Sequence, residues 1–105
     1  MSGLTKAAKV GEIPSGLGKK VEINGRDIAL FNIDGQFFAI DDMCPHRGGS
    51  LSEGSCDDKV VACPWHGWQF DVTNGSCLTS PSAQQQTYEV KVEGNDILIG
   101  VPLNR

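Results

Sequence analysis

Tight-turn dipeptides between short apolar stretches are the feature that most limits how this 105-residue chain can fold. Asn24-Gly25 follows the alternating residues 19–23, and Asp34-Gly35 follows residues 27–33. Such pairs favour two-residue hairpin turns, because asparagine, aspartate and glycine tolerate a positive φ. Two hairpins in succession predict an antiparallel meander that ends near residue 40.

The C-terminal part of the chain repeats this pattern. Strands are expected over residues 87–92 and 96–101, on either side of the turn at Gly94-Asn95. A first edge strand is expected over residues 6–13. The sequence contains thirteen glycines and five prolines and has no clear helical periodicity, so an all-β fold is predicted.

Residues 41–81 differ in texture from the two β-rich regions. Cys, His, Gly, Pro and Ser cluster here, with one short apolar run at residues 60–62, a strand expected over residues 68–72 and a turn at Asn74-Gly75. We interpret this region as a loop-rich insert of roughly 40 residues on a β scaffold, and such inserts usually carry the function. No linker or repeat divides the chain, so one domain over residues 1–105 is predicted.

Charge and hydropathy limit the classes of partner. The formal net charge is −4, which does not favour a nucleic-acid or anionic-membrane partner. Residues 1–9 contain no apolar core of a signal peptide, and no apolar run has membrane-spanning length. The expected location is the cytoplasm, where four cysteines are more typical of metal binding than of disulfides.

Two short motifs in the insert, Cys44-Pro45-His46 and Cys63-Pro64-Trp65-His66, contain both histidines of the chain. Thiolate and imidazole are good transition-metal ligands, and two ligands on each of two loops allow the loops to close over a metal. A structural zinc ion and a [2Fe–2S] cluster are both compatible with such a set. One Cys and one His per loop favours the cluster, since zinc fingers usually pair like ligands on one element.

The two motifs, with the sixteen residues 47–62 between them, resemble the C-x-H…C-x-x-H pattern of the Rieske family. The flanking hairpins are similar to the basal β domain of its bacterial single-domain members. The resemblance implies a Rieske fold, with an antiparallel β-sandwich or barrel-like base domain and a loop-rich cluster-binding subdomain. It also implies one [2Fe–2S] cluster, with Cys44 and Cys63 on the inner iron and His46 and His66 on the outer iron.

Four positions depart from the respiratory members of the family. By the resemblance, the disulfide of those proteins would fall at Gly49 and Trp65, and their Ser and Tyr hydroxyls at Trp68 and Phe70. Fewer hydroxyl donors to the cluster sulfurs disfavour the reduced, more negative state. A low reduction potential is therefore expected, and Trp65 is expected to cover the cluster rather than to anchor a partner.

The resemblance implies a soluble ferredoxin, an electron-transfer component that is not itself an enzyme. Its expected partners are an NAD(P)H-dependent flavoprotein reductase, which supplies single electrons, and a terminal oxygenase, which receives them. The alternative is the small subunit of an assimilatory NAD(P)H nitrite reductase, whose partner is the large subunit of that enzyme. A structural zinc module is the third reading.

Two groups of residues remain open at this stage. Cys56 and Cys77 do not repeat the ligand pattern and are expected to be small buried or half-buried thiols, with a redox-sensing pair as the alternative. Five acidic residues lie in or beside the insert: Asp41, Asp42, Glu53, Asp57 and Asp58. They form either a solvated loop surface or an acidic collar that speeds the encounter with a basic partner.

Overall fold

The computed structural model describes residues 2–23, 25–43, 50–54, 56–64, 67–79 and 84–102. The strands in these ranges are β1 (Ser2–Lys9), β2 (Gly18–Ile23), β3 (Arg26–Ile33), β4 (Gln36–Asp41), β5 (Cys56–Asp57), β6 (Val60–Ala62), β7 (Gln69–Asp71), β8 (Thr87–Glu93) and β9 (Asp96–Pro102). Two 3-10 turns, η1 (Val10–Glu12) and η2 (Leu51–Glu53), are the helical elements of the same ranges. Neither approaches the length and apolarity needed to cross a membrane. The predicted all-β class is confirmed.

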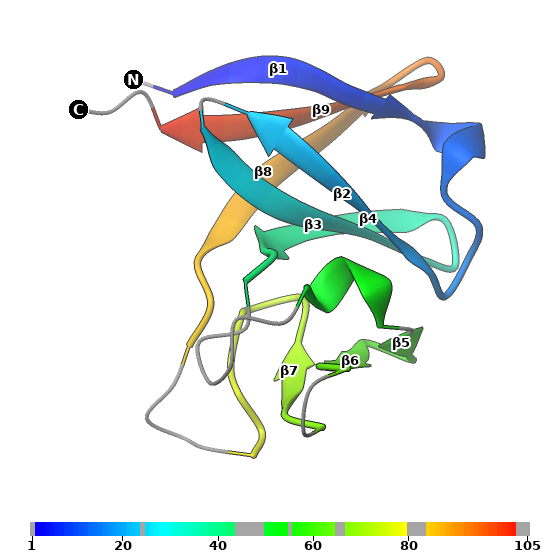
Figure 1. Ribbon diagram of the computed structural model, residues 1–105. Helices are drawn as coiled ribbons and strands as arrows, with labels where there is room; N and C mark the ends of the chain where they lie inside the picture. The colour runs from blue at the N-terminus through cyan, green and yellow to red at the C-terminus, as the bar shows by residue number, and fades with distance from the viewer. Residues whose placement is uncertain are drawn as a thin grey trace.

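Six strands form one antiparallel sheet in the order β1-β9-β8-β4-β3-β2. The two edge strands, β1 and β2, approach each other, so the sheet curls into a nearly closed barrel (Figure 1). Strands β5, β6 and β7 form a second, smaller sheet, and η2 lies between the two sheets in Figure 1. The predicted architecture, a barrel-like base with a loop-rich second part, is confirmed.

The predicted meander is strands β2, β3 and β4. The first hairpin closes at the pair Ile23 and Arg26, and the second closes at Ile33 and Gln36. In the second turn Asp34 and Gly35 have φ of 52° and 88°. This left-handed geometry matches the twist of the flanking strands, which is why an Asp-Gly pair serves here.

Strand β3 is shared by two hydrophobic cores, and its residues 28–32 are all buried. Ile28 and Leu30 belong to the core inside the barrel. Ala29 and Phe31 point the other way, into a second core that the small sheet covers. Because both faces of this central strand are buried, its sequence is a nearly continuous apolar run instead of an alternating one.

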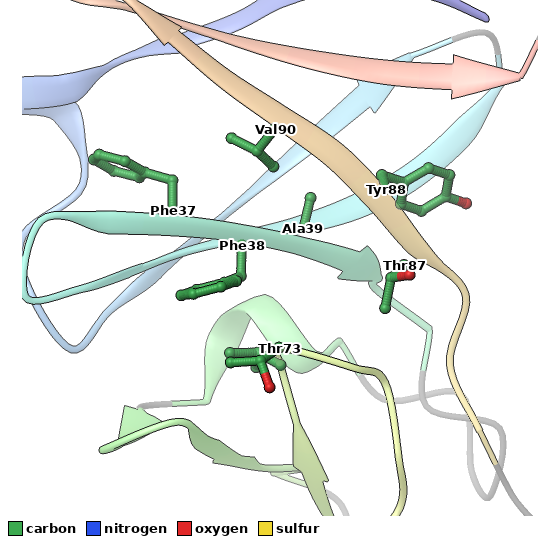
Figure 2. A pocket seen from close by; sticks show the side chains of 8 residues that line it. Phe37, Phe38, Ala39, Thr73, Thr87, Tyr88 and Val90 are labelled. Atoms are coloured by element: carbon green, nitrogen blue, oxygen red, sulfur yellow. The ribbon is translucent and has the colours of Figure 1, made fainter.

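Strand β4 is divided in the same way, as Figure 2 shows. Phe37 and Ala39 belong to the barrel core, and Phe38 packs against the second core on the side of Thr73. A depression of about 270 Å³ marks this joint between the two parts. Its lining consists of Phe37, Phe38, Ala39, Val72, Thr73, Thr87, Tyr88 and Val90. These side chains include no carboxylate, imidazole or thiol, so the depression offers no acid–base or nucleophilic group of those types.

The first strand differs from the sequence prediction, which placed it over residues 6–13. β1 starts at Ser2 and ends at Lys9, because its partner β9 starts at Asp96, opposite Lys9. The chain then turns through η1, where Glu12 Oε1 accepts the backbone N–H of Lys9 at 3.1 Å. The bounds of this strand are thus set by a partner almost ninety residues away.

Candidate metal centre

Of the four predicted ligands, Cys63 lies within the described residues, whereas Cys44, His46 and His66 lie outside them. What the structure describes is the base of each ligand loop. The first base comprises the end of β4 and Ser50, on either side of residues 44–49. The second comprises Cys63 and Pro64 with Gly67 and Trp68.

The two ends of the first loop are joined at their base. Met43 and Ser50 form an antiparallel bridge, and the N–H of Leu51 donates to the carbonyl of Asp42 at 2.8 Å. The Asp42 carboxylate adds two bonds, accepting from Ser50 Oγ at 2.6 Å and from the N–H of Ser52 at 2.8 Å. The loop therefore leaves and rejoins the scaffold at one fixed point.

The end of β4 is also tied to its neighbours. The Tyr88 hydroxyl donates to Asp41 Oδ1, and Arg26 Nη1 donates to the Tyr88 oxygen at 3.2 Å. Burial, together with the bond to Asp41, raises the pKa of Tyr88, so the phenol stays protonated as a donor. The N–H of Asp42 donates to the carbonyl of Asp27 at 3.0 Å. This strand end is a firm support for the loop that follows it.

The second loop begins at Cys63, directly after β6, and its side chain is only 2% exposed. The N–H of Cys63 donates to the carbonyl of Trp68 at 2.7 Å, and the N–H of Gly67 donates to the carbonyl of Cys63 at 3.1 Å. Gly67 has φ of +74°, a conformation that glycine adopts without the penalty of a Cβ. The second loop is thus also closed at its base.

The segment just after the first base and the start of the second base share one core. Leu51, which follows Ser50, and Cys63 belong to the same buried core. Gly54, just past the first base, lies so close to β6 that a Cβ there would overlap the carbonyl oxygen of Ala62. Because Ala62 immediately precedes Cys63, the segment that follows the first ligand loop lies against the strand that leads into the second.

The described residues fit an iron–sulfur cluster by the chemistry of the donor. A cysteine thiolate is the usual ligand of such clusters, and Cys63 is buried at the start of a closed turn. The described residues hold no group of three or more His, Cys, Asp or Glu side chains that could bind a metal by themselves.

Both alternatives for the five acidic residues, a solvated surface and an acidic collar, are wrong for Asp42 and hold only in part for Asp41. Asp42 is 3% exposed and binds the first loop base, and Asp41 is half-buried and accepts from Tyr88. Glu53, Asp57 and Asp58 are exposed. Sequence reasoning missed the structural role of Asp42 because its partners, Ser50 and Ser52, are recognisable only once the loop has closed.

The positions that bear on the predicted potential are only partly described. Phe70 is fully buried in the second core, and Trp68 packs against that core while remaining partly exposed. Neither side chain carries a hydroxyl. Gly49 and Trp65 lie outside the described residues, so the predictions about the disulfide and the cover stay predictions.

The two remaining cysteines are placed as expected. Cys77 is buried in the second core, and Cys56 is a half-buried free thiol that packs against it. Burial raises the pKa of the Cys56 thiol to about 11, from an ordinary value of 9.0. Both are therefore small core thiols, with Cys56 the more accessible.

Cys56 is expected to react slowly with alkylating reagents at neutral pH. A pKa of about 11 instead of 9.0 leaves roughly 100-fold less of the nucleophilic thiolate. Mass-spectrometric mapping of iodoacetamide labelling against pH measures this, with the urea-unfolded chain as the control. The unfolded thiol ionises around pH 9.0 and the folded one around pH 11. The free energy of unfolding is therefore expected to fall as the pH rises from about 9 to about 11. Labelling at pH 8 as fast as in urea would contradict the prediction.

The described structure is a barrel-like β base that carries two loops, each closed at its base, with a buried cysteine at the start of the second. The model of the Rieske [2Fe-2S] domain family matches residues 3–99. The chain belongs to this family, and the family predicted from the two motifs is confirmed.

Relatives of similar size narrow the class further. The chain is 39% identical over 97 residues to the biphenyl dioxygenase ferredoxin subunit of Pseudomonas sp. (strain KKS102), covering 90% of this chain and 89% of that one. It is 41% identical over 98 residues to the 3-phenylpropionate/cinnamic acid dioxygenase ferredoxin subunit of Escherichia coli (strain K12), covering 91% and 92%. Both relatives are ferredoxin subunits of dioxygenases.

Solved structures share the fold along nearly the whole chain. One is a ferredoxin in complex with the oxygenase of carbazole 1,9a-dioxygenase, with 30% identity, a TM-score of 0.85 and 92% of each chain covered. Another is a putative NADH-dependent nitrite reductase small subunit from Mycobacterium tuberculosis, with 25% identity, a TM-score of 0.91 and 99% of each chain covered. The fold is thus common to both functional classes considered from the sequence.

Proposed function

We propose that this protein is the ferredoxin component of a ring-hydroxylating dioxygenase system, an electron carrier that performs no catalysis of its own. It takes single electrons from an NAD(P)H-dependent flavoprotein reductase and delivers them to a terminal oxygenase. The observation that carries the proposal is the 39–41% identity to dioxygenase ferredoxin subunits over about nine-tenths of both chains. The solved complex of a ferredoxin with an oxygenase supports the class of partner.

The proposed cluster ligands are Cys44 and Cys63 on one iron and His46 and His66 on the other. The buried position of Cys63 at a closed turn supports this assignment. When bound, a [2Fe–2S] cluster supplies a centre that gains and loses one electron. The chain itself holds the two loops, through the Asp42 carboxylate at the first base and the Gly67 turn at the second.

The proposal also covers the domain organisation of the chain and its cellular location. Residues 1–105 form a single Rieske domain with its cluster-binding insert over about residues 41–81, supported by a family match over residues 3–99. The cytoplasm is the proposed location. The free thiol of Cys56 fits a reducing compartment.

A nitrite reductase small subunit is the second candidate. The structural likeness to such a subunit, with a TM-score of 0.91, favours it. The sequence relatives at higher identity favour the ferredoxin. The two candidates differ in the enzyme that reoxidises the reduced protein.

That difference is the test of function. The purified protein is reduced with NADH and a flavoprotein reductase, and its visible absorption is followed after addition of a terminal enzyme. We expect rapid reoxidation by the oxygenase of an aromatic-ring dioxygenase with its substrate and oxygen. Reoxidation only by the large subunit of a nitrite reductase with nitrite would favour the second candidate. A colourless protein that holds zinc alone would refute both.

The midpoint potential is expected in the negative part of the roughly −150 to +300 mV Rieske range. Trp68 and Phe70 supply no hydroxyl to the cluster sulfurs, so the reduced state gains less stabilisation. Spectroelectrochemical titration measures the potential. Phe70→Tyr, which restores a hydroxyl at a family position, is expected to raise it. A wild-type midpoint well above zero would contradict the prediction.

A further inference from the structure

We propose that Gln85 is a positioning residue for the first ligand loop, an inference that rests on the proposed assignment of Cys44 as a ligand. Gln85 lies just before β8 and is 6% exposed. Its side-chain Nε2 donates to the carbonyl of Asp41 at 2.9 Å and to the carbonyl of Met43 at 2.7 Å. Met43 is followed directly by Cys44.

The two bonds of Gln85 use both hydrogens of one amide group. In an extended chain alternate carbonyls point to the same side, so residues 41 and 43 face Gln85 together. The carbonyl between them, that of Asp42, accepts the N–H of Leu51 at 2.8 Å. The backbone that leads into Cys44 is therefore held from both sides, and one side chain, that of Gln85, binds two of its carbonyls.

Gln85 is itself held by the cluster-binding part of the molecule. Its N–H donates to the carbonyl of Gly75 at 2.8 Å. Gly75 has φ of +79°, and a Cβ there would overlap the carbonyl oxygen of Gln85. The next residue, Gln86, accepts the N–H of Asp41 at 2.9 Å. Gln85 thus links the turn after β7 to the end of β4.

Packing of the Met43 side chain does not hold this part of the backbone in place. The Met43 side chain is 63% exposed, so no apolar contact fixes it in a core. Its fixed points in the described structure are the bridge to Ser50 and the bond from Gln85. A merely structural Gln85 would change stability when replaced, whereas a positioning Gln85 would also change the metal centre.

The chain supplies matched controls, because Gln84, Gln85 and Gln86 are consecutive. Gln84 and Gln86 are exposed, and their amides contact the carbonyls of Asn74 at 3.4 Å and Thr87 at 3.0 Å. Within the described part of the chain, neither of these side-chain amides bonds to residues 41–43. Replacing each glutamine by methionine keeps the length of the side chain and deletes the donors.

The test compares these three variants as purified holoproteins. We expect Gln85→Met to shift the electron paramagnetic resonance g-values and to release iron to a chelator about tenfold faster, at the low end for loss of a supporting hydrogen bond. Hydrogen exchange of the peptide spanning residues 41–53 should also be faster. Gln84→Met and Gln86→Met should match the wild type. The proposal would be overturned if Gln85→Met had the g-values, the rate of iron release and the rate of hydrogen exchange of the wild type.

Loss of stability alone is separated by Ile97→Val, a change inside the barrel core away from the loop. If Gln85→Met releases iron no faster than Ile97→Val at equal loss of Tm, the proposal fails. If Gln85→Met does not fold, Gln85→Asn retains a shortened amide and is expected to show intermediate shifts, while wild-type behaviour there overturns the inference. A wild-type protein without a [2Fe–2S] cluster would refute the proposed function, and hydrogen exchange would still test Gln85.

Discussion

Cys63→Ser is expected to remove most of the visible absorption of the purified protein and to lower its unfolding free energy. A serine oxygen is a harder ligand than a thiolate and replaces it poorly in an iron–sulfur cluster. Loss of the cluster also removes the free energy that metal binding contributes to folding. The loss should reach at least about 3 kcal/mol, since metal binding and folding are coupled in small metal domains.

Absorption spectra, iron content and thermal unfolding measure this effect. Cys56→Ser is the matched control, because it makes the same atomic change at a half-buried thiol outside the ligand motifs. It should leave the visible spectrum nearly unchanged. If Cys56→Ser bleached the protein, or if Cys63→Ser kept its colour, the ligand assignment would have to be redrawn.

Asp42→Ala is expected to destabilise the base of the first ligand loop strongly. The substitution removes the acceptor of the Ser50 hydroxyl and of the Ser52 N–H. The buried N–H of Ser52 is left without a partner, which costs about 1–3 kcal/mol. The half-buried Ser50 hydroxyl keeps the Ser52 hydroxyl as a partner at 3.0 Å, so the total loss should be roughly 2 kcal/mol. Chemical denaturation followed by circular dichroism measures the loss, and iron release should also be faster because the loop is no longer closed.

Two variants frame this prediction. Asp57→Ala removes an exposed carboxylate of the same insert, and surface changes of this kind usually stay within about 0.5 kcal/mol. Asp42→Asn keeps one side-chain oxygen, which can accept the N–H of Ser52, and replaces the oxygen that faces Ser50 with an NH2 group. One of the two hydrogen bonds is retained, so an intermediate loss of stability is expected. Equal stability of Asp42→Ala and Asp57→Ala would show that the loop base does not depend on the carboxylate.

Local signals in the sequence predicted most of the scaffold. The turns at Asp34-Gly35 and Gly94-Asn95 lie between paired strands as expected, because positive-φ turn chemistry involves only adjacent residues. The expected strand over residues 68–72 matches β7 within one residue at each end, and β6 coincides with the apolar run at residues 60–62. The strand β5 and the turn η2 were not predicted, since a two-residue strand and a single 3-10 turn leave little periodic pattern to detect.

The sequence predicts the ligand residues of the candidate site but not the residues that support them. The ligand residues Cys44, His46, Cys63 and His66 were proposed from spacing and residue type, which are properties of short segments. The sequence predicts an exposed carboxylate at Asp42, whereas the structure shows a buried one. A carboxylate reads as a surface group until its partners are known, because charged residues are rarely buried unless they are paired.

By itself the sequence determined the β meander, the family and the residue types that can hold iron, since turn dipeptides and ligand motifs act within a few residues. Only the tertiary structure decided where β1 ends, which face of β3 serves which core, and that Asp42 and Gln85 support the first ligand loop. Gln85 reaches Met43 across 42 positions of the chain. Contacts of that range depend on how the two sheets pack, and no local pattern encodes them.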